Sequence, residues 1–364
     1  MTPLERELVT IIAAEGPIGV DRYMALCLGH ARHGYYMQKD PFGTGGDFTT
    51  APEISQMFGE LIAVWCLAAW QAMGAPSAFR VIELGPGRGT LMADLLRAAR
   101  VMPGFNEAAT IALVETSPLM RQCQNVTLSQ AGSAVEWHAS LDDVPRGPQI
   151  LLANEFFDAL GFQQFVRMDS GWHERRVGID ETGKLVFGLA PHPLPPALVP
   201  RWAHSAAPGE VMEISPARND LARAIGDRLK AMGGAALIFD YGHVRSAPGD
   251  TFQAVRGHAF QHVLDRPGEC DLTSHVDFEA LAAALRQGGA RVHGPLAQGA
   301  FLSAMGLSER ALILKGHADT SSRAEIDAAV DRLAGQAQMG HLFKVIAATH
   351  PDMTPPFPFE QYCP

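Results

Sequence analysis

Three glycines directly behind a short apolar run constrain the fold of this chain more than any other feature. Residues 80–84 read Arg-Val-Ile-Glu-Leu, and Gly85, Gly87 and Gly89 follow them, ahead of good helix formers at 90–100. This order predicts a buried parallel strand, a glycine turn and a helix that begins at Thr90. Because glycine has no Cβ, a ligand can approach the backbone of such a turn closely.

The glycine spacing discriminates between nucleotide-like ligands. Dinucleotide-binding folds use G-x-G-x-x-G, whereas this chain has G-x-G-x-G with Glu83 just ahead of it. The pattern resembles motif I of the class I S-adenosylmethionine (SAM) methyltransferases. SAM carries an amino-acid end and a sulfonium cation but no pyrophosphate, so a carboxylate beside the turn suits it. A plain structural turn is the alternative interpretation.

The chain continues in an α/β rhythm. We predict further strands at 110–115, 135–138, 149–153, 235–239, 290–295 and 342–349, and helices at 216–232 and 277–286. The resemblance implies a Rossmann-like, seven-stranded sheet that closes with an antiparallel strand. The fold class predicted is therefore α/β, a class I SAM-dependent methyltransferase.

Two segments interrupt or extend this sheet. Residues 1–75 are predicted to form an N-terminal helical extension, in which a helix begins at Thr50 with Glu53 completing a capping box. The glycine-rich loop 41–50, with Asp47, is interpreted as a lid over the cofactor, or alternatively as a surface connection. The methyltransferase domain spans 76–160 and 211–364, and 161–210 is a β-rich insertion, a candidate substrate-binding or interface element.

Further cofactor contacts are predicted at the ends of the next two strands. Glu115 ends the second strand, where an acid in nucleotide-binding folds accepts hydrogen bonds from the ribose hydroxyls. Capping of the following helix is the alternative role for Glu115. Ser140 follows the third strand, where the adenine ring would lie. The three glycines would admit the methionine portion of SAM, and Glu83 would face its cationic end.

The residues after the fourth strand are the predicted catalytic group. Asn154, Glu155 and Asp158 follow 149–153, and strands one and four lie side by side at the ligand-binding edge of such a sheet. The segment is similar to the Asn-x-x-aromatic motif of amine methyltransferases, but Glu155-Phe156 replaces Pro-Pro. A carboxylate suits a guanidinium, which it can hold through parallel hydrogen bonds. Alternatively, Asn154 and Asp158 cap a turn while the aromatic residues Phe156 and Phe157 pack in the core.

Composition excludes several classes of function. A net charge of −10 and a sequence pI of about 5.8 argue against nucleic-acid binding. Five scattered cysteines without a C-x-x-C pair suggest neither disulfides nor zinc, and His258 and His262 lack an H-E-x-x-H context, so no metal is expected. The acidic N-terminus and the lack of a long apolar run predict no leader and no membrane span, and therefore a chain that is cytoplasmic or already processed.

Five motifs together carry a closer resemblance. The segments 46–55, 83–92, 154–160, 240–242 and 271–278 are similar to those of the MidA family of SAM-dependent methyltransferases. Mitochondrial members of that family symmetrically dimethylate an arginine of a core subunit of respiratory complex I during its assembly. The resemblance implies SAM as cofactor and a protein arginine, carried by a complex I subunit, as substrate. A small-molecule amine or oxygen methyltransferase and a non-enzymatic SAM-binding assembly factor stay open as alternatives.

Overall fold

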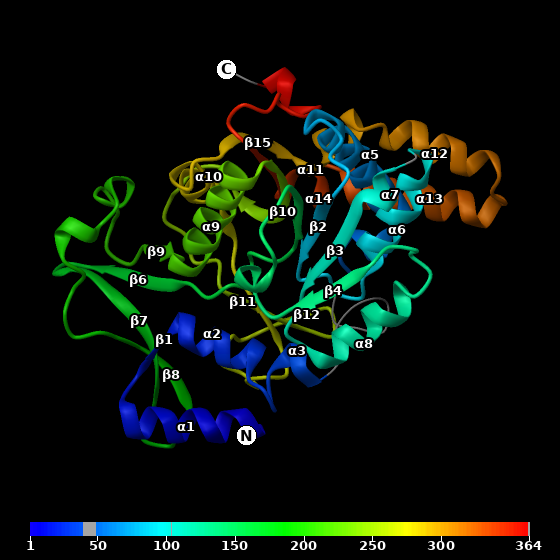
Figure 1. Cartoon of the computed structure of the whole chain (residues 1–364). Coiled ribbons are helices and arrows are strands. Elements are labelled where there is room, and N and C mark those ends of the chain that lie inside the picture. The colour runs from blue at the N-terminus through cyan, green and yellow to red at the C-terminus, as the bar shows by residue number, and fades with distance from the viewer. Residues whose placement is uncertain (39–48, 103, 363–364) are drawn as a thin grey trace.

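A mixed β-sheet forms the centre of the computed structural model, which describes residues 1–38, 49–102 and 104–362 (Figure 1). The strand order is β15-β16-β10-β5-β2-β3-β4, and a two-residue strand, β14, pairs with β10. All pairs on this path are parallel except those of β16, which runs antiparallel to both neighbours. The strands are β2 Phe79–Leu84, β3 Ala109–Val114, β4 Val135–His138, β5 Gln149–Asn154, β10 Gly234–His243, β14 Val276–Asp277, β15 Arg291–Ala297 and β16 Phe343–Thr349. The predicted seven-stranded sheet with a final antiparallel strand is confirmed.

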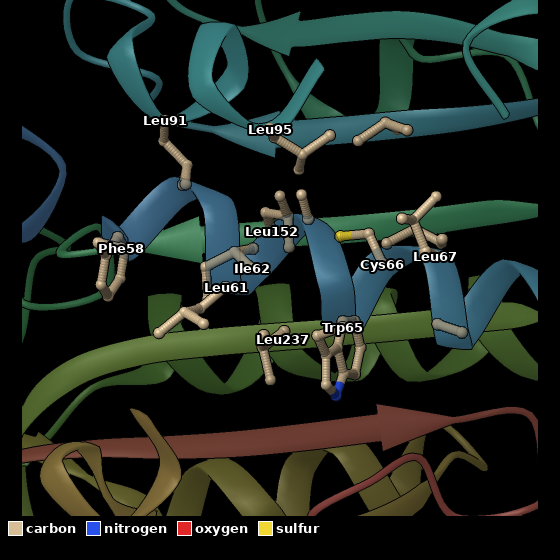
Figure 2. Close-up of a cluster of buried hydrophobic side chains, with 14 of the residues drawn as sticks. Phe58, Leu61, Ile62, Trp65, Cys66, Leu67, Leu91, Leu95, Leu152 and Leu237 are labelled. Atoms are coloured by element: carbon tan, nitrogen blue, oxygen red, sulfur yellow. The ribbon is translucent and has the colours of Figure 1, made fainter. Parts of the chain in front are cut away.

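Alternation of side chains along each strand gives the sheet two apolar faces. In β2, Val81 faces one side and Ile82 the other, and both are fully buried. The helices α5 (Gln56–Ala72) and α6 (Thr90–Ala98) cover the face of Val81. Figure 2 shows Ile62 and Trp65 of α5 beside Leu152 and Leu237 of the sheet. On the other face lie α9 (Pro216–Met232) and α10 (Phe278–Gln287).

The N-terminal helices pack on two smaller sheets. The helices α1 (Pro3–Glu15) and α2 (Val20–Gly29) share a core with residues such as Phe162, Val177 and Leu272. One sheet has the order β1-β7-β6-β9, with β8 paired to β7, and the other has the order β12-β11-β13. Their strands are β1 Ile18–Gly19, β6 Gln163–Met168, β7 Gly171–Ile179, β8 Leu185–Leu189, β9 Val211–Ile214, β11 Gln253–Arg256, β12 Ala259–Gln261 and β13 Asp271–Thr273. Since β9 pairs with β6, the sheet of the insertion extends beyond residue 210.

A helix begins after Thr50 as predicted, but it is interrupted and its predicted capping box does not form. The chain forms a short helix, α4 (Ala51–Ile54), and breaks at Ser55, whose extended backbone lets its hydroxyl accept a hydrogen bond from the Met57 amide at the start of α5. Thr50 makes no side-chain cap. Glu53 instead accepts a 2.5 Å hydrogen bond from the Thr90 hydroxyl, so this carboxylate binds the distant glycine turn rather than its own helix.

Short helices complete the chain. They are α3 Tyr35–Gln38, α7 Phe105–Ala108, α8 Pro118–Thr127, α11 Gln298–Ala304, α12 Leu307–Gly316, α13 Thr320–Ala334 and α14 Met339–Leu342. The last four connect β15 to β16, and α12 and α13 extend at the upper right of Figure 1, where α12 packs on α5. Within the part of the chain that the structure describes, no helix is both long and apolar enough to cross a bilayer.

Candidate active site

A cavity of about 490 Å³ opens at the carboxyl ends of the central strands. Residues after β2, β3 and β5 meet there, and Tyr241 joins them from the end of β10, as expected at the switch point of a doubly wound sheet. Its walls also include segments far apart in the sequence. The described lining residues are Ala25, Leu28, Gly29, Tyr36, Met37, Thr50, Gly85, Gly87, Val114, Glu115, Thr116, Met120, Ala139, Glu155, Phe156, Asp158, Ala159, Leu160, Gly161, Tyr241, Gln253, Val255, Asp271 and Thr273.

The glycine turn has a backbone that only glycine adopts readily. The φ angles of Gly85, Gly87 and Gly89 are +61°, +52° and +84°. A Cβ on Gly85 would lie 2.6 Å from the Phe156 ring. Gly85 and Gly87 line the cavity, whereas Gly89 begins α6 and lies against Gln124. The turn therefore leaves its backbone open to a ligand at two of its three glycines.

Glu83 is a buried acid with an unsatisfied oxygen. Its exposed fraction is 3%, and its Oε2 atom has no hydrogen-bond partner among the described residues. Burial raises the pKa of Glu83 to about 8. Together with Gly85, Gly87 and Asn154 it lines a recess of about 40 Å³ beside the main cavity. A cation in this recess would satisfy the carboxylate, which agrees with the predicted role of Glu83.

Glu115 lies at the end of β3 with its carboxylate held in one orientation. Its Oε1 accepts a 2.7 Å hydrogen bond from the Ser117 amide, and its Oε2 accepts a 3.2 Å bond from the Gln124 side chain. Burial raises the pKa of Glu115, although these two hydrogen bonds oppose the rise. Each oxygen keeps a further lone pair, so the group can still accept two ribose hydroxyls. The N-cap of α8 is Ser117, whose hydroxyl accepts the Met120 amide, so Glu115 does not take the alternative role of capping this helix.

Asn154 is the last residue of β5, one position beyond the predicted end of the strand, and Glu155 follows it. The Asn154 amide donates to Glu155 Oε1 at 3.1 Å, and the same oxygen accepts the Ala51 amide of α4 at 3.1 Å. Glu155 has a φ of +50°, an uncommon conformation for a residue other than glycine. Burial, with added repulsion from Asp158 and Asp271, raises its pKa to about 7. The strained backbone and perturbed carboxyl are features that concentrate at functional sites.

Asp158 and Asp271 meet in the same cavity, each bound by a tyrosine. The Tyr241 hydroxyl donates to Asp158 Oδ2 at 2.7 Å, and the Tyr36 hydroxyl donates to Asp271 Oδ1 at 2.8 Å. The other oxygen of Asp158, Oδ1, is buried with no partner in the described part of the chain. Burial raises the pKa of Asp158, and the nearby Arg218, which donates to the Asp158 carbonyl at 2.9 Å, lowers it.

Sequence reasoning placed some site residues and missed others. Ser140 is exposed and donates to Asp143 at 2.8 Å, while its neighbour Ala139 lines the cavity. The role predicted for Asp47 falls outside the described residues. No functional role was predicted for Tyr36 or Gln124. The one sequence signal for either residue was that Tyr36 forms an adjacent aromatic pair with Tyr35. Within residues 1–38, 49–102 and 104–362, no three His, Cys, Asp or Glu side chains form a metal-ligand group.

Comparison with known proteins gives the family. Residues 61–296 match the model of the family described as "Putative S-adenosyl-L-methionine-dependent methyltransferase". The chain belongs to this family. It is 38% identical to the Danio rerio "Protein arginine methyltransferase NDUFAF7, mitochondrial", over 93% of this chain and 85% of the relative. It is 36% identical to the Homo sapiens protein of the same name, over 95% and 83%. The predicted membership of this methyltransferase family is confirmed.

A solved structure supports the same conclusion. A Burkholderia thailandensis protein bound to S-adenosyl-homocysteine has a TM-score of 0.84 and 30% identity, covering 95% of this chain and 92% of that chain. A native structure of a protein from the same organism has a TM-score of 0.83 at 31% identity. The chain is therefore a SAM-dependent methyltransferase, and the predicted fold class and cofactor are confirmed.

The residues of the cavity fit this cofactor. Gly85 and Gly87 present backbone without side chains to the cavity, and the orphaned buried oxygen of Glu83 calls for a cationic or hydrogen-bond-donating group. Gly85 and Gly87 would hold the methionine portion, Glu83 its charged end and Glu115 the ribose. When bound, SAM supplies a methyl group activated by the sulfonium charge. The chain's own task is to align an acceptor and to exclude water.

Proposed function

We propose that this methyltransferase modifies an arginine side chain of a protein. The observation that carries the proposal is the charge of the cavity. Four carboxyl groups line it, from Glu115, Glu155, Asp158 and Asp271, and none of its described lining residues is Lys, Arg or His. Such a wall favours a cationic acceptor and disfavours an anionic one.

The acids beyond the ribose position would act on the guanidinium. Asp158 presents its unpartnered Oδ1 while Tyr241 holds Oδ2, so the carboxylate is oriented before the substrate arrives. Glu155 lies between the recess of Glu83 and the main cavity, since it lines both. It would attract the guanidinium toward the donor side and stabilise its charge. Alignment of bound reactants can lower a barrier by about 7 to 11 kcal/mol, so a strong base is not required.

The relatives support this substrate class. Two of them bear the name protein arginine methyltransferase, at 36% and 38% identity over most of the chain. Following the family resemblance, we propose symmetric dimethylation and a subunit of respiratory complex I as the target. The cytoplasm stays the proposed location, on the basis of the cysteine usage.

The test uses the whole chain and its substrate pool. The purified chain and SAM with a labelled methyl group are added to a lysate of cells that lack this protein, and proteins are analysed by mass spectrometry. We expect label on the guanidinium nitrogens of an arginine in one or a few proteins. Label recovered only in small molecules would overturn the proposal in favour of a small-molecule methyltransferase.

A variant of Asp158 tests whether the acidic wall of the cavity contributes to protein methylation. Asp158→Asn keeps the shape of the side chain but removes its charge, so we expect at least about tenfold slower protein methylation with S-adenosyl-homocysteine affinity changed less than about threefold. Asp169→Asn makes the same change at an exposed position of the β6–β7 turn and is expected to have no effect. Equal loss in both variants, or no loss in Asp158→Asn, would contradict the role of the acidic wall.

A further inference from the structure

Gln124 is a buried amide whose hydrogen bonds reach two walls of the cofactor cavity. It lies on α8 with none of its surface exposed. Its Nε2 donates to the Gly87 carbonyl at 2.8 Å and to Glu115 Oε2 at 3.2 Å. Both Gly87 and Glu115 line the cavity, whereas Gln124 itself does not. One amide thus connects the glycine turn after β2 to the acid at the end of β3.

The orientation of this amide is fixed by a third strand. The Trp137 indole N–H, on β4, donates to Gln124 Oε1 at 2.9 Å. Because the oxygen is held by that donor, the two N–H groups of the amide must point toward Gly87 and Glu115. Packing adds to the constraint, since a Cβ added to Gly89 would lie 3.5 Å from the Cα and Cγ atoms of Gln124. All polar atoms of the side chain therefore have partners, as a buried amide requires.

We propose that Gln124 is a positioning residue for the nucleoside part of the cofactor. It holds the Glu115 carboxylate in the rotamer that receives the ribose hydroxyls, and it holds the Gly87 turn at a fixed distance from that carboxylate. The Ser117 amide fixes Oε1 of Glu115, so the Gln124 bond to Oε2 is the second point that defines the plane of the carboxylate. The inference rests on Glu115 as the ribose acceptor.

The physical reason is preorganisation. Without the amide, the Gly87 carbonyl loses a partner and the Glu115 carboxylate can rotate about its last bond. The cofactor would then have to order both groups on binding, so its affinity falls while its reactive end is unaffected. A residue that only supported the fold would instead change stability and turnover together.

The decisive variant is Gln124→Met, which keeps the length of the side chain but removes its hydrogen bonds. We expect the dissociation constant of S-adenosyl-homocysteine, measured by calorimetry, to rise about tenfold, because the bonds to Gly87 and Glu115, two of the three that the amide makes, fix the cavity wall. The KM for SAM should rise similarly, with kcat and the KM for the protein substrate changed less than about threefold. Gln122→Met on the exposed face of the same helix is the matched control and should leave the dissociation constant unchanged.

An analogue of S-adenosyl-homocysteine without the two ribose hydroxyls separates this mechanism from a general one. In the native chain it should bind more weakly than S-adenosyl-homocysteine, and in Gln124→Met that difference should shrink, because the variant acts through Glu115. A difference that is the same in both chains would overturn the proposal. Equal binding of the two compounds by the native chain would also overturn it, since Glu115 would then not hold the ribose; arginine methylation would be untouched by that result.

A second variant covers the case in which Gln124→Met does not fold. Trp137→Phe removes the N–H that orients the amide, together with part of the ring, and leaves both donors of Gln124 in place. We expect a smaller rise in the dissociation constant, about twofold to fivefold, in the same direction. An unchanged constant in a Trp137→Phe chain with native unfolding behaviour would show that the orientation of the amide does not matter and would reject the inference.

Discussion

Replacing Glu83 with glutamine is expected to remove a loss of stability that the native, cofactor-free chain undergoes as pH rises. The same replacement is expected to weaken cofactor binding. Glu83 is buried beside the turn with an unpartnered oxygen, and its pKa is raised from an ordinary value of 4.5 to about 8 by burial. The folded chain therefore binds a proton that the unfolded chain releases between these two pH values. The contribution of protonated Glu83 to the free energy of unfolding is therefore present in full below pH 4.5 and is lost as pH rises toward 8.

The size of this effect follows from the shift. Each pKa unit corresponds to about 1.4 kcal/mol, so between pH 5 and pH 8 the native chain should lose about 3 kcal/mol of unfolding free energy at Glu83. Glutamine has the same shape and does not titrate. Its buried N–H groups carry a cost, but this cost is the same at both pH values. The difference between variant and native chain should thus move by about 3 kcal/mol in favour of Glu83→Gln.

Urea unfolding of the cofactor-free chain at pH 5 and at pH 8 measures this difference. Glu181→Gln, on an exposed turn where burial is absent, is the control and should show no pH-dependent gain. A difference that changes by less than about 1 kcal/mol between the two pH values would refute the reasoning. At pH 7 most of the native Glu83 is protonated, so cofactor binding should also release a proton, seen as a buffer-dependent calorimetric enthalpy that Glu83→Gln lacks.

Two further predictions separate the cofactor from the acceptor. Gly87→Val places a branched side chain at a φ of +52° on the cavity wall. We expect the affinity for S-adenosyl-homocysteine, measured by calorimetry, to fall at least about a hundredfold while the circular dichroism of the fold is retained. A native affinity in this variant would show that the turn is not part of the site. Glu155→Gln should keep S-adenosyl-homocysteine affinity within about threefold but slow methyl transfer at least about tenfold. Because the pKa of Glu155 is about 7, the native rate should rise as pH passes 7, and a variant with the same rate and the same pH profile would assign Glu155 to structure.

Local sequence determined the central sheet and the glycine turn because their signals act over short distances. The apolar run of β2 and the glycines after it predict strand, turn and helix without any knowledge of the rest of the chain. The break at Ser55 was not predictable in this way. Glu53 has the spacing of a capping box, but its carboxylate accepts from Thr90, 37 residues later, and a tertiary contact thus replaces the local one.

The two tyrosines that bind acids of the site have partners far along the chain. Tyr36 donates to Asp271, 235 positions away, and Tyr241 to Asp158, 83 positions away. No periodicity or spacing predicts such pairs. Tyr36 meets Asp271 because the N-terminal extension shares a core with the small sheets, and Tyr241 meets Asp158 because β10 pairs with β5.

Binding of the proposed cationic ligands would offset the energetic cost of ionising the buried acids of the site. Burial raises the pKa of Glu83, Glu155 and Asp158, which means that the folded chain without ligands pays to ionise them. A sulfonium or ammonium group against Glu83 and a guanidinium against the other two acids would remove that cost, so part of the binding energy of each cation comes from the relief of repulsion and desolvation. A neutral acceptor of the same size gains nothing from this relief. Under the proposed function, the cavity would therefore select its acceptor by charge as well as by shape.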